Sequence, residues 1–470
     1  MANIGIFGGS FNPPHRGHLL AAAEFQRRLG LDRVILMPAA LPPHKALAAG
    51  SPDAHTRLEL TRLAAQDLPF AEVSDLELHR SGASYTADTL EELHRQYPND
   101  HLWFLMGTDM LLTFAQWHAP ERIAKLASLA VAHRGRDDGK TLRDAAQQLR
   151  DRFGAEVVLV ENDFLPYSST IARAMLAFRC GEDYLEPAVY DAVCAQGLYH
   201  TRRDLRALPL DALARVALPL HDPKRVPHVL GCSHTAAELA ARFGEDPGPA
   251  RRAGLLHDVT KALPGPEQLK LCDKYGMMLD TFERSHPKLL HAKSGAAVAG
   301  AVFGESAAVQ SAICWHTTGK PDMTLLQKIL YLADYMEPNR DFPGVERLRA
   351  LAEHDLDEAV LLGLEMSLDL LTETGQPIDV NSRAARDFLK SERTKSECGN
   401  YSATAAAALP AGAMSPGSRP SAAVRRCSPM CSAPSQTRTR SRACVIMPTA
   451  RRRSTVRRRK RMITRFCSNI

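Results

Sequence analysis

The chain has 470 residues, of which 45% are apolar and 24% are charged, and its formal net charge is +6. This length exceeds one ordinary hydrophobic core, so we expect a soluble globular protein of two or three domains. Residues 401–470 hold 14 Arg, one Lys and no acidic residue, which leaves a net charge of −9 for residues 1–400. The net charge of the folded part therefore gives no support for nucleic-acid binding.

Cysteine usage and hydropathy predict the compartment. The ten cysteines form no CxxC pair, and five of them fall inside apolar or helical runs: Cys180, Cys194, Cys232, Cys272 and Cys314. We expect these to be free thiols in a reducing compartment. The N-terminus lacks the basic and apolar regions of a signal peptide, and no stretch reaches the roughly 18 apolar residues of a membrane span. We therefore expect a cytoplasmic protein without a membrane segment.

Residues 1–202 alternate short apolar runs with amphipathic segments. The apolar runs begin at residues 3, 33, 101, 128 and 156, and helical patterns cover residues 18–29 and 52–65, the second behind a Ser51 cap. This alternation predicts an α/β, Rossmann-like domain in which helices cover both faces of a parallel sheet. Ligands of such sheets bind beyond the carboxyl ends of the strands, at a switch point in the strand order.

The stretch GGSFNPPHRGH, residues 8–18, follows the first apolar run and precedes a helix. Gly8 and Gly9 let a ligand approach the backbone, and the exposed amides at the start of the helix form a phosphate seat. Ser10 and Phe11 are expected to bind the same substrate. His15 and His18 add donors that become cationic when protonated. The stretch is neither a Walker loop nor a GxGxxG fingerprint. It predicts a site for a nucleotide polyphosphate.

The stretch YSSTIAR, residues 167–173, opens a helix that is expected to run to Phe178. Ser168, Ser169 and Thr170 offer hydroxyls and free amides, and Arg173 lies one turn inside, where its guanidinium can bind phosphate oxygens. A plain N-cap cluster would explain the three hydroxyls equally well if they stood alone. Beside the first stretch, they indicate a second phosphate seat on the same sheet.

Other candidate binding residues follow the predicted strands. The set comprises Lys45 in the loop PPHK, Thr86 in SYTADTL as a helix cap, Gly107 and Asp109 in GTD, and Trp117. A lysine in a loop is usually only solvated, and a threonine before a helix is often a structural cap. The Asp109 carboxylate suits ribose hydroxyls, whereas Trp117 either stacks on a planar ring or belongs to the core.

These motifs, in this order, resemble the nicotinate-nucleotide adenylyltransferases over the region from Ile4 to Tyr199. The resemblance implies transfer of AMP from ATP to nicotinate mononucleotide with Mg²⁺, and it adds Arg134 to the substrate-binding residues. This sequence departs from the family at Ala172 and at Arg134-Gly135-Arg136, which affects packing more than chemistry. Nicotinamide mononucleotide and pantetheine phosphate remain alternative acceptors. Catalysis is expected from His15, His18, Lys45, Arg173 and the metal by positioning and charge stabilisation.

After a polar linker at residues 203–215, helical periodicity dominates residues 216–392 and predicts an all-α domain. Six of its residues carry side chains that are costly to bury without a metal: His228, His257, Asp258, His291, His316 and Asp334. Any one of them alone is more often a satisfied core residue or a cap. Together they form a nitrogen and oxygen set that suits one or two ions such as Fe, Mn, Co, Ni or Zn.

The strings GLLHDVTK, LLHAKSGA and HTTGKPDMTLLQKILYLADYMEPNRDFPGVE resemble the HD phosphohydrolase superfamily, in the branch of symmetrical bis(nucleosyl)-tetraphosphatases. The resemblance implies that the six residues hold two metal ions, that Lys261 reaches phosphate, and that Asn339 and Arg340 lie near the substrate. The implied substrates are dinucleoside polyphosphates, with diadenosine tetraphosphate cut into two ADP. A metal-dependent, nucleotide-binding regulator of the first domain is the alternative.

Residues 393–470 lose hydrophobic periodicity and become rich in Ala, Ser, Pro and Arg. One interpretation is a disordered basic arm for RNA or an anionic surface. We favour a segment without selected function, such as a frame-shifted read-through, because basic arms seldom combine many alanines with cysteines. Nucleic acid is not expected to bind elsewhere on the chain, and a homo-oligomer is compatible with the sequence.

Overall fold

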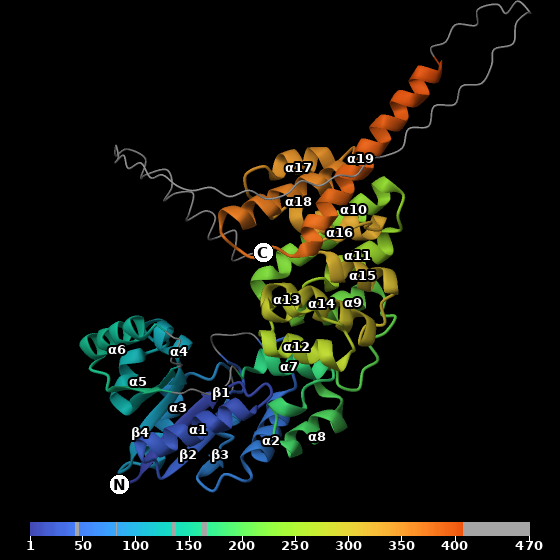
Figure 1. Ribbon diagram of the computed structural model, residues 1–470. Coiled ribbons are helices and arrows are strands. Elements are labelled where there is room, and N and C mark those ends of the chain that lie inside the picture. The colour runs from blue at the N-terminus through green and yellow to red at the C-terminus, as the bar shows by residue number, and fades with distance from the viewer. Residues whose placement is uncertain (43–46, 81, 134–137, 162–166, 408–470) are drawn as a thin grey trace, which may run out of the picture. The chain divides into compact units, whose positions relative to one another are not determined.

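A computed structural model describes residues 1–407 apart from 43–46, 81, 134–137 and 162–166 (Figure 1). The chain forms two compact units, Met1–Arg386 and Asp387–Ile470. The sheet and most of the helices belong to the first unit, so the boundary expected between residues 202 and 203 stays a prediction. No helix among the described residues is long and apolar enough to cross a membrane.

The first part of the chain builds one six-stranded parallel sheet in the order β3-β2-β1-β4-β5-β6. The strands are β1 (Asn3–Gly9), β2 (Arg33–Pro38), β3 (Ala71–Val73), β4 (His101–Gly107), β5 (Ser128–His133) and β6 (Val157–Glu161). The expected α/β fold is confirmed. β3 was not expected, because three residues are too few to show an alternating pattern.

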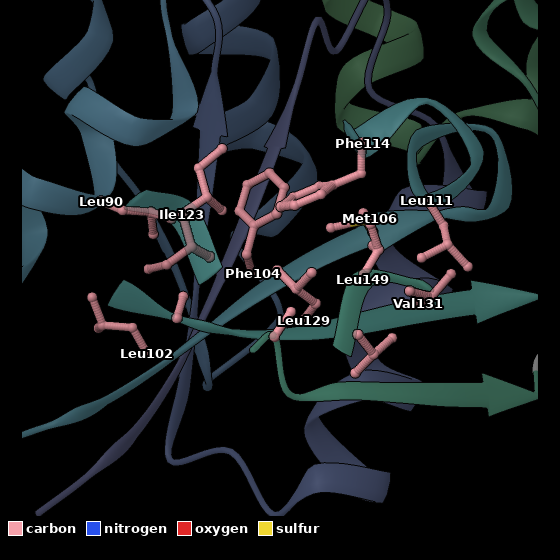
Figure 2. Close-up of a cluster of buried hydrophobic side chains, with 14 of the residues drawn as sticks. Leu90, Leu102, Phe104, Met106, Leu111, Phe114, Ile123, Leu129, Val131 and Leu149 are labelled. Atoms are coloured by element: carbon pink, nitrogen blue, oxygen red, sulfur yellow. The ribbon is translucent and has the colours of Figure 1, made fainter. Parts of the chain in front are cut away.

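One face of the sheet carries a buried apolar cluster, which Figure 2 shows around Phe104, Met106 and Leu129. The strand residues of this cluster are spaced by two, as in Leu102, Phe104 and Met106, because alternate side chains point to the same face. The helices that supply the opposite side are α3 (Thr86–Gln96), α4 (Thr108–Thr113), α5 (Pro120–Leu126) and α6 (Gly139–Phe153). The cluster packs these four helices against the sheet.

The other helices of this region are α1 (Arg16–Leu29), α2 (Ala54–Ala65), α7 (Ser169–Ala177) and α8 (Pro187–Gln196). The N-cap of α2 is Asp53, which accepts a hydrogen bond from the Thr56 amide, and not Ser51 as expected. The Ser51 hydroxyl instead donates to the Ala48 carbonyl at 2.5 Å. Thr86 is not the helix cap that the sequence suggested: it is the first residue of α3, and the N-cap is Tyr85, whose side chain makes no capping hydrogen bond.

The described residues from 203 to 407 contain helices, turns and loops, with no β-strand among them. They are α9 (Leu210–Ala217), α10 (Val226–Phe243), α11 (Pro247–Leu256), α12 (Gly265–Lys274), α13 (Thr281–Ser285), α14 (Pro287–Ala301), α15 (Ala307–Trp315), α16 (Leu325–Met336), α17 (Val345–Ala352), α18 (Leu356–Glu373) and α19 (Val380–Ala407). The all-α prediction is confirmed. The segment 203–215, expected as a polar linker, buries Leu205 and Leu213 and begins α9.

Two helix ends differ from the sequence expectation. The pattern 248–262 predicts one helix, but α11 ends at Leu256 and the chain turns over residues 257–262. α19 continues to Ala407, beyond the expected end of the domain at residue 392. Most of the tail, residues 408–470, lies outside the described residues. The five cysteines named above are free, as expected.

Candidate active sites

The strand order reverses between β1 and β4, which are neighbours in the sheet although two strands, β2 and β3, separate them in sequence. Pairing between the two strands stops at Ile6 and Phe104, whereas β1 continues to Gly9 and β4 to Gly107. The last residues of the two strands are therefore not paired with each other at the switch point, which is where such sheets bind ligands. The turn after β1, Gly107 at the end of β4, and Asp109 in the first turn of α4 lie at this edge.

Long-range hydrogen bonds hold the turn after β1. Asn12 is buried, donates to the Ser51 hydroxyl at 2.6 Å and accepts from the Tyr199 hydroxyl at 2.8 Å. The Arg57 guanidinium, also buried, donates to the Ser10 carbonyl at 2.7 Å. Phe11 has a positive φ of 43° and buries its ring. The turn is thus rigid, and its backbone is the part that a ligand can meet.

The rings of His15 and His18 contact each other at a tilt of 31°, with centroids 3.7 Å apart. The His15 amide donates to Nδ1 of His18 at 3.1 Å, which places the His18 proton on Nε2. Burial lowers the pKa of His18 to about 4, and burial together with His18 and Arg173 lowers the pKa of His15 well below its usual value. Burial therefore favours the neutral form of both rings.

The helix start at Ser168 closes onto this turn. Ser168 is the N-cap of α7 and accepts from the Ile171 amide, as the sequence indicated. The Ser169 hydroxyl donates to the Pro13 carbonyl at 3.2 Å, and the Arg173 guanidinium donates to the Asn12 carbonyl at 2.6 Å. A second nitrogen of Arg173 donates to the Thr170 hydroxyl at 3.3 Å. The two expected phosphate seats therefore form one contiguous surface.

The remaining residues expected at this site are less closely joined to it. Asp109 is exposed in the first turn of α4. Trp117 packs on Phe104 and Phe114, with centroids 6.0 and 5.4 Å apart, which favours its role in the core. Lys45 and Arg134 lie outside the described residues.

A second site lies among the helices, where all six expected metal ligands converge. Nε2 of His228 is 3.3 Å from Nε2 of His257 and 3.2 Å from Oδ1 of Asp334. Nε2 of His291 is 3.3 Å from both Nε2 of His316 and Oδ1 of Asp258. These residues come from α10, the turn after α11, α14, the end of α15, and α16. The turn that ends α11 early is what brings His257 and Asp258 inward.

The hydrogen bonds of these rings test whether the site suits a metal. Nδ1 of His257, His291 and His316 lies 2.7–2.8 Å from a backbone carbonyl, so the proton resides on Nδ1 and each Nε2 carries a lone pair. Lone pairs thus face one another and the Asp258 carboxylate, whose Oδ1 is buried and accepts no hydrogen bond. Converging acceptors without protons repel one another, and a cation among them removes that repulsion. The residues present therefore fit a divalent metal.

Three cations surround the ligand carboxylates. Arg225 and Lys261 contact Asp258, the latter at 3.4 Å, and Arg340 donates to Asp334 at 2.7 Å. Burial alone would raise the pKa of Asp258. The positive charge of Lys261 and the nearby His257 outweigh this effect and hold the pKa well below its usual range. Both carboxylates are accordingly ionised at neutral pH. Asn339, expected near the substrate, donates a hydrogen bond from its side-chain amide to Glu337 at 2.8 Å.

Comparisons with known proteins agree with this division. Residues 6–175 match the cytidylyltransferase-like family model, and residues 225–339 match the HD domain model. A probable nicotinate-nucleotide adenylyltransferase of Carboxydothermus hydrogenoformans is 37% identical, over 42% of this chain and 98% of that protein. One of Thermomicrobium roseum is 39% identical, over 43% of this chain and 93% of that protein.

The chain belongs to the nicotinate-nucleotide adenylyltransferase family. The adenylyltransferase region is followed by an HD domain. A solved structure from Clostridium acetobutylicum, described as a predicted HD superfamily hydrolase involved in NAD metabolism, is 37% identical over 39% of this chain and 98% of that chain, with a TM-score of 0.38. A Plasmodium falciparum nicotinic acid mononucleotide adenylyltransferase complexed with NaAD is 19% identical over 43% of this chain, with a TM-score of 0.37.

Sequence reasoning missed several residues of the two sites. In the adenylyltransferase region it missed Arg57, because an arginine in an amphipathic helix normally reads as a surface residue. In the HD domain it missed Arg225, although its position three residues before His228 places both on one helical face. It also missed Glu337, whose carboxylate lies 3.1 Å from Nδ1 of His228.

Proposed function

We propose that this chain is a bifunctional enzyme. Its first region transfers AMP from ATP to nicotinate mononucleotide, giving nicotinate adenine dinucleotide and pyrophosphate. Its HD domain hydrolyses dinucleoside tetraphosphates, such as diadenosine tetraphosphate, symmetrically to two nucleoside diphosphates. The observation that supports the first activity best is the joined surface of the turn after β1 and the start of α7.

The chemistry of the first reaction requires little proton transfer. The phosphate of the mononucleotide is already anionic at neutral pH, so the enzyme needs donors and orientation more than a base. The neutral His18 ring offers an Nε2–H donor, because its Nδ1 accepts from the His15 amide. Arg173 supplies the permanent positive charge beside the turn. Mg²⁺ would enter with ATP and supply charge neutralisation at the polyphosphate.

The acceptor is the first test of this proposal. The purified full chain is given ATP, Mg²⁺ and, in turn, nicotinate mononucleotide, nicotinamide mononucleotide and pantetheine phosphate, and the products are separated chromatographically. We expect the highest kcat/KM with nicotinate mononucleotide. Preference for either other acceptor would reject the proposed substrate while the nucleotidyltransferase chemistry stood.

The proposed hydrolase centre uses the six ligands for two divalent ions of the Fe or Mn class, which would supply Lewis acidity and an activated water. The residues of the chain prepare the phosphate site around them. Arg225, Lys261 and Arg340 already face the ligand carboxylates, and their guanidinium and ammonium groups would turn to the phosphate oxygens of a bound substrate. A dinucleoside polyphosphate carries several adjacent negative charges, which matches three clustered cations.

The hydrolase proposal is tested with diadenosine tetraphosphate and protein reloaded with Mn²⁺ or Fe²⁺. Two ADP are expected, whereas ATP with AMP would contradict symmetrical cleavage. Asp258→Asn should abolish hydrolysis and reduce metal content while adenylyl transfer persists, and Asp246→Asn, at a surface cap of α11, is the matched control. Equal hydrolysis by metal-stripped protein would refute the site. Metal-dependent changes in adenylyl transfer without any hydrolysis would favour a regulatory HD domain.

A further inference from the structure

One of the four clustered histidines is oriented differently from the others. Nδ1 of His257, His291 and His316 lies against the carbonyls of Gly254, Lys288 and Ile313. Nδ1 of His228 lies instead 3.1 Å from a carboxylate oxygen, Oε1 of Glu337. A carboxylate accepts the Nδ1–H more strongly than a carbonyl does, which makes the opposite nitrogen a better electron donor. His228 therefore has a partner of a different chemical kind.

The Glu337 carboxylate is buried and held in place, with only 1% of the residue exposed. Its Oε2 accepts from both the backbone amide and the side-chain amide of Asn339, each at 2.8 Å. The Asn339 side chain also donates to the Pro227 carbonyl at 3.1 Å, next to His228 in sequence. One oxygen of Glu337 thus contacts His228 and the other accepts from Asn339. Asn339 in turn links the carboxylate to the start of α10 through the Pro227 carbonyl.

Gly231 provides the space that this carboxylate occupies. A Cβ at this position would lie 2.3 Å from Oε2 of Glu337 and 3.1 Å from Nδ2 of Asn339, both closer than ordinary contact. Gly231 lies three residues after His228 in the interior of α10, where glycine costs about 1 kcal/mol relative to alanine. The close approach of Glu337 explains a glycine at a position that a helix disfavours.

We propose that Glu337 is a positioning residue of the metal centre, supported by Asn339 and Gly231. Its carboxylate holds the His228 ring with Nε2 directed at Asp334 and His257, and it strengthens that nitrogen as a ligand. The inference rests on the proposed metal centre and adds residues to it. It also assigns Asn339 to the support of a ligand, where the family resemblance had placed it near the substrate.

Glu337→Gln keeps the size of the side chain and removes its charge. We expect divalent-metal affinity to fall by roughly 10- to 100-fold, as losses of such hydrogen-bond partners do. The affinity is measured on the full chain by titration with Co²⁺, whose visible absorption reports the ligand field, and thermal unfolding is measured without metal. Glu305→Gln is the matched control, because this buried carboxylate pairs with Arg252 and touches none of the six ligands.

Gly231→Ala tests the same inference from the other side of the contact. The added methyl group should displace the carboxylate and weaken Co²⁺ binding in the same direction. Combining it with Glu337→Gln should cost less than the sum of the two single effects, because both act through one contact. Leu230→Ala, at a neighbouring exposed position of the same helix, should leave Co²⁺ binding unchanged.

The outcomes separate this inference from the proposed function. Weaker Co²⁺ binding and an altered absorption spectrum in both variants, with wild-type thermal stability in the absence of metal, support it. Wild-type affinity in both variants overturns the inference alone, and so does a loss of thermal stability with unchanged affinity, since that marks a purely structural role. A wild-type chain that binds no divalent ion overturns both the inference and the hydrolase proposal.

Discussion

The buried Arg57 provides a demanding test of how the first site is built. Arg57 is 0% exposed, and its guanidinium donates to the carbonyls of Ser10, Ala39 and Ala40 at 2.7, 2.8 and 3.1 Å. These bonds join α2 to the turn after β1 and to the end of β2. Arg57→Met keeps much of the side-chain volume but leaves the three carbonyls without their donor.

The expected loss of stability in Arg57→Met follows from the three hydrogen bonds that the substitution removes. A hydrogen bond to a charged group contributes about 1.5–3 kcal/mol, and the three together are offset in part by the cost of burying the guanidinium. We expect a net loss of about 3–5 kcal/mol in the free energy of unfolding. For a region of about 200 residues this corresponds to a fall in Tm of roughly 6–20 °C.

Differential scanning calorimetry of the full chain measures this fall in Tm. The unfolding transition of the adenylyltransferase region is identified as the one whose Tm rises when ATP is added. Arg62→Met is the matched control, because Arg62 lies on the same helix with 45% of its side chain exposed and should change stability by less than about 1 kcal/mol. The KM for ATP should also rise in Arg57→Met, since Ser10 belongs to the phosphate turn. A Tm within 2 °C of the wild type would refute the reasoning, on the scale of about 2–4 °C per kcal/mol.

Three further predictions follow from the same structure. His18→Ala should lower adenylyl transfer by about 10²- to 10³-fold with unchanged circular dichroism, as expected for the loss of one donor to the transition state, and near-normal turnover would reject the site. Because the pKa of His18 is lowered to about 4, the unfolded chain binds its proton first as the pH falls, so stability should drop from pH 6.5 towards 4. His18→Gln should reduce this drop in pH-dependent unfolding measurements, and an identical pH profile would contradict the lowered pKa. A chain that ends at residue 407 should retain both activities in the two product assays, and loss of either would give the remaining segment a function.

The sequence predicted much of the sheet and the side chains that converge at the second site, because each carries a strong local signal. The strands at residues 3, 33, 101 and 128 are apolar runs, and β3 escaped prediction because it is only three residues long. His257 and Asp258 were identified from the motif, although the helix pattern continued through them. The helical periodicity of residues 248–262 does not reveal the turn that begins at His257, because apolar residues continue at helical spacing after Leu256.

Residues that act through long-range contacts could not be predicted. Arg57 and Ser10 are 47 positions apart, and Glu337 and His228 are 109 positions apart. Nothing local distinguishes such residues from surface charges, since their role depends on which elements the fold brings together. The lowered pKa values of His15 and His18 could not be predicted either, because burial lowers them and a motif carries no measure of burial.

The central claim is that one chain carries two independent catalytic centres. It is tested most directly by measuring adenylyl transfer to nicotinate mononucleotide and cleavage of diadenosine tetraphosphate in the same preparations of wild type, His18→Ala and His257→Ala. We predict that His18→Ala loses only the transfer and His257→Ala loses only the cleavage. Loss of both reactions in either folded variant, or a wild type that lacks one of them, would contradict the account.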